Sequence, residues 1–186
     1  MKERKLNRLK DYDYSQNGYY FVTICTKNRE AWFGKIESGK MILNQYGEIV
    51  ERHWKEMPNY YKNVEIDEFI IMPNHIHGII IINRNYNDGI VGTEHCSVPT
   101  EKNHGLLSNI VKSFKNAVTK RVHDQFQDYG FKWQRSFYDH IIRDEIPLNK
   151  IREYITNNPL KWESDIENKI NFKESNKDYY KKIIEG

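Results

Sequence analysis

Two histidines near the middle of the chain have the spacing of a metal-binding pair. His75 and His77 open the apolar run HIHGIIII, directly after Pro73 and Asn74. Proline at the first central position of a turn, followed by asparagine, favours a tight turn, so the pattern predicts a hairpin whose second strand covers residues 75–82. Successive side chains of a strand point to opposite faces. Both imidazoles therefore share one face, where they can converge on one metal ion.

A tyrosine and an asparagine further along the chain have the spacing of neighbours on a helix. Tyr154 and Asn158 lie in residues 148–158, where apolar residues repeat at helical spacing between Pro147 and Pro159. Side chains four residues apart stack on one face of a helix, so this pair can place a phenol nucleophile beside a third metal ligand. Both pairs also have a purely structural reading, as histidines bonded to the backbone at a strand end and as polar residues on a helix surface. The spacing alone leaves the two readings open.

The elements that must position these residues follow from the hydrophobic periodicity. Apolar and alternating runs predict strands over residues 18–26, 64–71, 75–82 and 137–142. Helical spacing predicts helices over residues 45–57, 106–126, 148–158 and near 178–184. Residues 33–43 are expected to form a loop or weak hairpin, and residues 83–103 a long loop. This order predicts an α+β fold with a central antiparallel sheet and helices packed on it.

Length and composition narrow the class of protein. The 186 residues suit one domain over residues 1–186, with a charged C-terminal extension from about residue 163. The net charge of +3 is weak evidence for a polyanionic partner, but the first ten residues carry five Lys or Arg, either as a solvated tail or as phosphate contacts. Cys25 and Cys96 have neither metal-type nor redox-type spacing, which predicts reduced thiols and a cytoplasmic protein. No apolar run reaches the length of about 18 residues that a membrane span needs.

Four segments resemble motifs of the single-tyrosine HUH transposases, which are named for a His-hydrophobic-His signature. The segment MPNHIHGII is similar to that signature. The segment REYITNNP is similar to the helix that carries the family's catalytic tyrosine, with a carboxamide four residues later. The segment FKWQRSFYDHIIR resembles the stretch that links these two motifs in the REP-associated branch of the family, and DYDYSQNGYYFVTICTKNRE resembles the opening strand of that branch. The similarity covers roughly residues 4–162. A His-X-His motif alone is common, but these motifs in this order are a strong signal.

The resemblance implies a ferredoxin-like, RRM-like HUH endonuclease fold and the cleavage and joining of single-stranded DNA. His75, His77 and Asn158 would hold a divalent ion, Mg²⁺ or Mn²⁺, that polarises the scissile phosphate. Tyr154 would attack phosphorus, form a 5′-phosphotyrosine and release a 3′-hydroxyl. Because the bond energy stays in the adduct, a second 3′-hydroxyl can reverse the step. The expected substrate is single-stranded DNA that forms hairpins.

Further residues are candidates for supporting roles. His140 lies in the FYDHIIR segment and is expected to assist as a base or to orient a phosphate, with a structural role equally open. Tyr138 is a rival nucleophile that lacks a carboxamide one helical turn away. Basic residues on the long helix and around the linking segment are candidates for DNA binding, namely Lys112, Lys115, Arg135 and Arg143.

Two other classes of function are compatible with the sequence. A catalytically inactive single-stranded nucleic-acid binding module on the same scaffold would bind DNA but form no covalent adduct. A metal-dependent hydrolase that uses His75 and His77 with water as the nucleophile would keep its turnover in a Tyr154→Phe variant. The oligomeric state is open as well, because in a homodimer Tyr154 can act on the histidines of the other subunit. No membrane partner is expected.

Overall fold

The computed structural model describes residues 12–83, 105–171, 179–180 and 182–183. The basic residues 1–10, Cys96 and nearly all of the expected loop over residues 83–103 lie outside these ranges. Within the described part of the chain, no helix combines the length and the apolar character that crossing a membrane requires.

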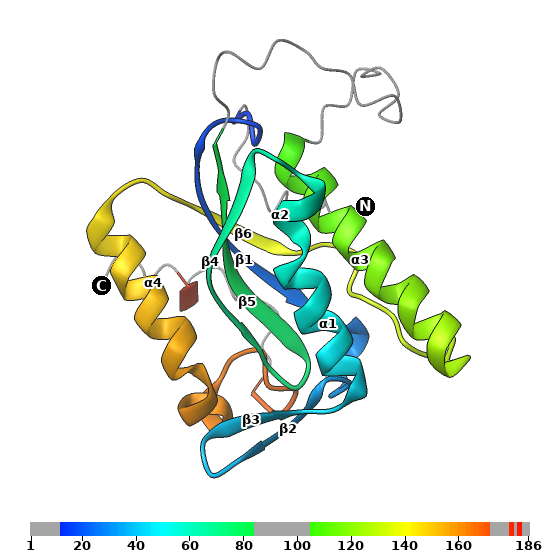
Figure 1. The fold of residues 1–186 in the computed structure, drawn as a ribbon. Coiled ribbons are helices and arrows are strands. Elements are labelled where there is room, and N and C mark those ends of the chain that lie inside the picture. Colours follow the sequence, from blue (N-terminus) through cyan, green and yellow to red (C-terminus); the bar gives the residue numbers. More distant parts are fainter. Residues whose placement is uncertain (1–11, 84–104, 172–178, 181, 184–186) are drawn as a thin grey trace, which may run out of the picture.

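A four-stranded antiparallel sheet forms the centre of the molecule (Figure 1). Its strands are, in spatial order, β4 (Val64–Ile71), β5 (His75–Ile82), β1 (Gly18–Cys25) and β6 (Tyr138–Ile142). The expected hairpin of β4 and β5 is confirmed, with Pro73 and Asn74 in the turn between the two strands. A separate two-stranded sheet consists of β2 (Gly34–Glu37) and β3 (Lys40–Leu43), where a loop or weak hairpin was expected.

The helices are α1 (Gln45–Lys55), α2 (Met57–Tyr60), α3 (Gly105–Phe126) and α4 (Glu145–Asn157), with the 3-10 turns η1 (Lys27–Arg29) and η2 (Asn158–Ser164). The helix expected over residues 45–57 ends earlier, because Pro58 lacks an N–H and is accommodated in the first turn of the separate helix α2. Helix α4 begins at Glu145 instead of residue 148, since the first turn of a helix does not use the N–H that Pro147 lacks. Residues 179–180 and 182–183 are helical, inside the last predicted helix.

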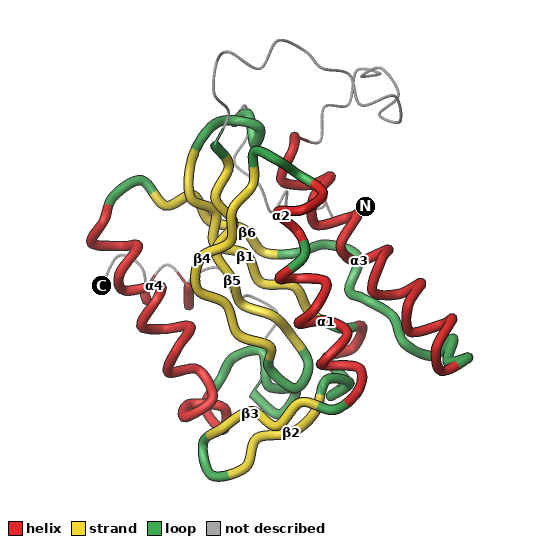
Figure 2. Tube along the Cα trace, in the orientation of Figure 1, coloured by secondary structure: helices red, strands yellow, loops and turns green. Residues whose placement is uncertain are grey.

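The chain order β1, α1, β4, β5, α3, β6 is the βαββαβ order of the ferredoxin-like fold. Helices α1 and α3 cover one face of the sheet, and α4 covers the other (Figures 1 and 2). The first face packs around Trp54 and Val22, and the second around Phe21 and Ile151. The predicted α+β class, with a central antiparallel sheet and helices packed on it, is confirmed.

The pairing register determines where the two histidines point. His75 and His77 pair with residues of β1 whose side chains face α4, and directly paired residues share a face. On the opposite face Gly78 lies under Trp54, whose Cζ2 would be only 2.3 Å from an added Cβ. The glycine therefore lets the indole lie directly on β5, behind the two imidazoles.

A candidate metal and tyrosine site

His75 is held as a neutral imidazole with one unsatisfied ring nitrogen. Its side chain is fully buried, and burial lowers its pKa to about 4. Asn74 donates its Nδ2 to the carbonyls of Arg29 and Glu167, at 3.1 and 2.9 Å. Oδ1 of Asn74 must therefore accept, at 2.8 Å, from Nδ1–H of His75. Nε2 of His75 then keeps its lone pair and has no hydrogen-bond partner among the described residues.

His77 connects the sheet to the candidate nucleophile. Its Nδ1 lies 2.9 Å from Oγ1 of Thr23, and its Nε2 lies 3.1 Å from the hydroxyl of Tyr154. Burial lowers the pKa of His77 to about 3, and the neighbouring His75 contributes to the shift. Burial also raises the pKa of Tyr154 well above its ordinary value, and the charge of Asp165 adds to this effect. At neutral pH the neutral imidazole of His77 therefore faces the protonated phenol of Tyr154, and both belong to the same chain.

Asn158 and Asp165 complete the buried group. Both side chains are buried, and Nδ2 of Asn158 donates to Oδ2 of Asp165 at 2.7 Å. A carboxylate only accepts, so the amide nitrogen is the atom that faces it. Oδ1 of Asn158 is left without a hydrogen-bond partner in the part of the chain that the structure describes. Asp165 also accepts from the backbone N–H of Glu167 at 2.6 Å, which fixes its carboxylate just after η2.

This buried group has the chemistry of a divalent-metal site. Ligand atoms of His75, His77 and Asp165 lie within 4.8 Å of one another. The two unsatisfied atoms, Nε2 of His75 and Oδ1 of Asn158, both carry a free lone pair, and buried polar atoms without a partner call for an explanation such as an ion. Two imidazoles suit first-row transition metals, whereas amide and carboxylate oxygens suit Mg²⁺ and Mn²⁺. The residues therefore fit a divalent ion, with Asp165 supplying the negative charge that neutral ligands lack.

The predicted ligands, His75, His77 and Asn158, do not include Asp165. This residue lies beyond the motifs, in the charged segment that follows residue 162, where an isolated carboxylate carries no spacing signal. Glu167 in the same segment is also buried, and it accepts from Nε of Arg29 at 2.7 Å. The segment expected to be a charged extension thus contributes two buried carboxylates, of which Asp165 belongs to the group of possible metal ligands.

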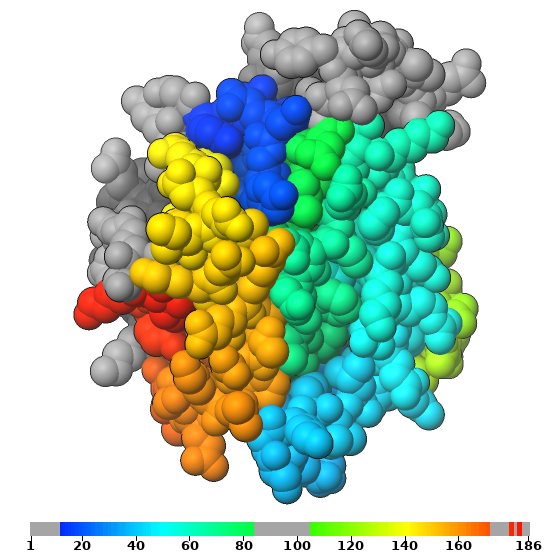
Figure 3. Space-filling model, turned by 60° about the vertical axis from the view of Figure 1, so that its left-hand side comes forward, coloured from blue at the N-terminus to red at the C-terminus, as the bar shows by residue number. Residues whose placement is uncertain are grey.

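Aromatic side chains from the C-terminal part of the chain flank the two imidazoles. The ring centroid of Trp162 is 6.1 Å from that of His75, and the centroid of Tyr180 is 5.9 Å from that of His77. Tyr154 itself is only 7% exposed. On the face shown in Figure 3, α4 and the C-terminal residues form the surface over this side of the sheet. A phosphodiester can reach the buried atoms only when part of this cover moves.

The supporting candidates on β6 share the histidine face but lie beyond β1. His140 pairs with Phe21 of β1, so β1 separates it from the histidines of β5. The ring of Tyr138 stacks on Tyr180 with 4.5 Å between centroids. The structure therefore brings Tyr154, and not Tyr138, into hydrogen-bond contact with His77. The role of His140 stays a prediction.

The predicted DNA-binding residues differ in exposure. Lys115 is half-buried, and its Nζ donates to the carbonyls of residues 134 and 136 at 2.9 and 3.3 Å. Burial lowers the pKa of Lys115 to about 8. This lysine holds the segment before β6 in place, and its contact with DNA stays a prediction. The other three residues are exposed, namely Lys112, Arg135 and Arg143.

Comparison with known proteins finds relatives in sequence and in fold. An uncharacterized protein of Haemophilus influenzae is 41% identical over 165 residues, which cover 87% of this chain and 91% of that protein. A second protein of this organism, named as a REP-associated tyrosine transposase, is 26% identical over 149 residues, or 80% of this chain and 74% of that protein. Among solved structures, a REP-associated tyrosine transposase bound to a REP hairpin has a similar fold, with a TM-score of 0.56 and 18% identity over 84% of this chain and 74% of that one. No family model matches the chain.

Proposed function

We propose that the chain is a REP-associated tyrosine transposase that acts as a transposase-type single-stranded DNA endonuclease and strand transferase. The sequence relative of that name and the similar fold of the solved transposase support the proposal. The observation that carries this proposal is a buried tyrosine hydroxyl 3.1 Å from Nε2 of His77, beside the unsatisfied ligand atoms of His75 and Asn158. Its proposed substrate is single-stranded DNA that forms hairpins, in line with the related transposase that was solved with a REP hairpin.

Tyr154 is the proposed nucleophile. Its oxygen attacks phosphorus, and the bond from phosphorus to the 3′-oxygen breaks. The phenol proton is transferred, through a base, to the released 3′-hydroxyl, and the 5′-phosphate remains on the tyrosine. One phosphodiester replaces another, so the step needs no nucleotide cofactor and a second 3′-hydroxyl can reverse it to join strands. His75, His77, Asn158 and Asp165 would hold a Mg²⁺ or Mn²⁺ ion, which would supply Lewis-acid polarisation of the scissile phosphate.

His77 has two tasks that exclude each other. In the tautomer whose Nδ1–H donates to Thr23, the lone pair of Nε2 either accepts the hydroxyl proton of Tyr154 or binds a metal. A metal bound through Nε2 of His77 would therefore take the place of the hydrogen bond to Tyr154.

A covalent-adduct assay tests the reaction class and the nucleophile together. The full chain is incubated with labelled hairpin-bearing single-stranded oligonucleotides, with Mn²⁺ or with EDTA, and the products are separated on a denaturing gel. We expect a metal-dependent band of protein joined to DNA in the wild type. Tyr154→Phe abolishes this band, whereas Tyr138→Phe, the matched control on the same face of the sheet, keeps it.

Other outcomes point to other functions. Cleavage without an adduct that survives Tyr154→Phe would identify a metal-dependent hydrolase with water as the nucleophile. Binding without cleavage, with a hairpin pool that a related transposase does cleave, would identify a nucleic-acid binding module. An adduct that is lost in Tyr138→Phe and kept in Tyr154→Phe would assign the nucleophile to β6.

A further inference from the structure

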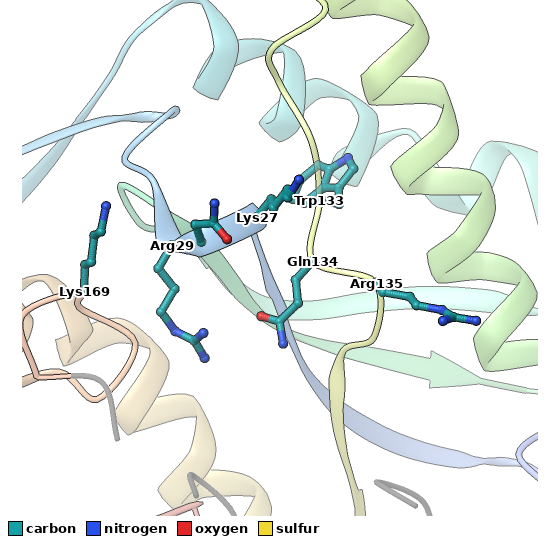
Figure 4. A pocket seen from close by; sticks show the side chains of 7 residues that line it. Lys27, Arg29, Trp133, Gln134, Arg135 and Lys169 are labelled. Carbon is teal, nitrogen blue, oxygen red and sulfur yellow. The ribbon is translucent and has the colours of Figure 1, made fainter. Parts of the chain in front are cut away.

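A concave pocket of about 450 Å³ lies beside the buried site, where three segments of the chain meet. Turn η1, the residues just before β6 and the turn after η2 line it, chiefly with Lys27, Arg29, Trp133, Gln134, Arg135 and Lys169. Figure 4 shows Arg29 and Gln134 extending in the same direction, with Lys169 on one side of them and Arg135 on the other. The volume is in the range of sites for small ligands, and it suits a single nucleotide better than a duplex.

The charge of this pocket favours an anion. Lys27, Arg135 and Lys169 are exposed, and none of them forms an ion pair with another described residue. Arg29 is paired with Glu167, yet the described residues that line the pocket include no carboxylate. In a protein that processes DNA, lysines and arginines arranged in this way contact backbone phosphates.

Two uncharged groups in the pocket suit an unpaired base. Trp133 is partly exposed at the pocket and is fixed by its Nε1, which donates to the carbonyl of Lys115 at 3.1 Å. The carboxamide of Gln134 forms no hydrogen bond with the described residues, so it offers a donor and an acceptor to a ligand. Aromatic rings that stack on bases, combined with basic side chains, are typical of single-strand binding.

The backbone of the pocket is held in a conformation that needs support. Asn28 and Arg29 have φ values of 56° and 52°, a region that residues other than glycine rarely adopt. Such conformations persist only where neighbouring structure determines them, and they cluster at functional sites. Here the N–H of Lys27 donates to the carbonyl of Lys132 at 2.8 Å, and the N–H of Gln134 donates to residue 25 at 2.9 Å. These bonds fix the two walls of the pocket relative to each other.

The pocket and the candidate metal ligand His75 depend on the same two residues. Glu167 accepts from Arg29 in the pocket wall, and its backbone carbonyl accepts from Asn74. Asn74 also donates to the carbonyl of Arg29 and accepts from Nδ1 of His75. A nucleotide in the pocket would therefore lie next to the group that orients His75.

We infer that this pocket binds one unpaired nucleotide of the strand that carries the scissile phosphate, next to the point of cleavage. The phosphates on either side of this nucleotide contact Lys27, Lys169 and Arg135, and the base lies against Trp133 and Gln134. The identity of the polymer as DNA rests on the proposed function. A duplex end or a blunt hairpin has no single-stranded flank beside its stem and does not use the pocket.

Binding without chemistry tests this inference. Fluorescence anisotropy is measured on the full chain in EDTA, with a short fluorescein-labelled single strand of mixed sequence and with a blunt hairpin. The Lys27→Ala/Lys169→Ala variant is compared with Lys40→Ala/Lys120→Ala, which removes two exposed lysines outside the pocket. We expect the pocket variant to bind the single strand about tenfold more weakly, and the slope of log K against log salt to fall by about 1.4, or 0.7 for each lost phosphate contact. Binding of the blunt hairpin stays as in the control.

Each remaining outcome counts against a stated part of the inference. An equal loss of single-strand affinity in the two double variants would show that only the overall charge matters, and it would overturn the inference about the pocket. Weaker binding of the blunt hairpin, to the same extent as the single strand, would assign the lysines to duplex contact instead. The binding measurement needs neither metal nor nucleophile. If the pocket variant binds the single strand as tightly as the control while the wild type forms the Tyr154 adduct, only the inference about the pocket is rejected. Loss of the adduct with pocket-dependent binding rejects the proposed chemistry alone.

Discussion

Replacing Asp165 by asparagine tests whether the buried group holds a metal. The substitution keeps the shape of the side chain but replaces two carboxylate oxygens, which accept from Nδ2 of Asn158 and from the N–H of Glu167, by one amide oxygen and one NH2 group. It therefore removes the negative charge and one hydrogen-bond acceptor. A ligand that binds only the folded state stabilises it by about 2.7 kcal/mol when its free concentration is roughly 100 times Kd. For a chain of this length 1 kcal/mol corresponds to about 2–4 °C in Tm. The wild type should therefore gain about 5–11 °C at that Mn²⁺ concentration.

The expected loss in the variant follows from the charges. A divalent cation and a carboxylate about 4 Å apart attract each other by roughly 8 kcal/mol at an effective dielectric constant near 20. Removing two charges from water opposes this by several kcal/mol, which leaves about 3 kcal/mol, or roughly a hundredfold in Kd. At the same Mn²⁺ concentration Asp165→Asn is then only half-saturated. Its stabilisation falls to about 0.4 kcal/mol, or a shift in Tm of about 1–2 °C.

Differential scanning fluorimetry with a Mn²⁺ titration, from an EDTA baseline, measures both shifts. Asp139→Asn is the matched control, since Asp139 is a buried carboxylate on β6 that pairs with Val22 and so lies on the opposite face of the sheet. This control should keep the full wild-type shift. The reasoning is refuted if Asp165→Asn retains the full shift while its Tm in EDTA matches the wild type, or if both variants lose it equally.

The other predictions concern the nucleophile, the packing behind the histidines and the cover of the site. Tyr154→Phe removes the hydroxyl that competes for the imidazole Nε2, so Mn²⁺ affinity in calorimetry should rise roughly fivefold, the equivalent of one hydrogen bond of about 1 kcal/mol; a fall would make the phenol itself a ligand. Gly78→Ala places a Cβ 2.3 Å from Trp54 and should lower the free energy of unfolding in urea by about 1–3 kcal/mol, a loss that should shrink when Trp54→Leu is added. Tyr180→Ala should uncover this side of the sheet. Alkylation of the buried Cys25 thiol, measured by mass spectrometry, and formation of the covalent adduct with DNA should then both become faster. Unchanged alkylation would show that other residues form the cover.

Periodicity predicted the parts of the fold that depend on local pattern. Strands β4 and β5 have the predicted bounds because the Pro-Asn turn separates two uninterrupted apolar runs. The common face of His75 and His77 follows from the two-residue repeat of a strand, and the common side of Tyr154 and Asn158 follows from the helical repeat. Each of these statements needs only the geometry of one element.

The rest of the site depends on contacts between distant segments, which no repeat encodes. Asp165 reaches Asn158 through the 3-10 turn η2, whose direction is set by packing and not by a residue pattern. The same limit applies to the pocket, where Lys27 and Lys169 are more than a hundred positions apart in the sequence. Lys115 is a further example. The sequence suggested that its ammonium group is free to bind DNA, but this group donates to two backbone carbonyls of a distant segment.

The C-terminal part of the chain both completes the buried group and covers it, and the structure separates these two tasks. Asp165 is fixed in a compact turn, where its carbonyl accepts from the N–H of Asn168 at 3.2 Å and from Nδ2 of Asn171 at 3.1 Å. Tyr180 docks later in the chain, through a hydroxyl bond to Glu167 at 2.8 Å and through ring contacts. Displacing Tyr180 breaks none of the hydrogen bonds that hold Asp165. The cover can therefore open while the proposed ligand Asp165 stays in place.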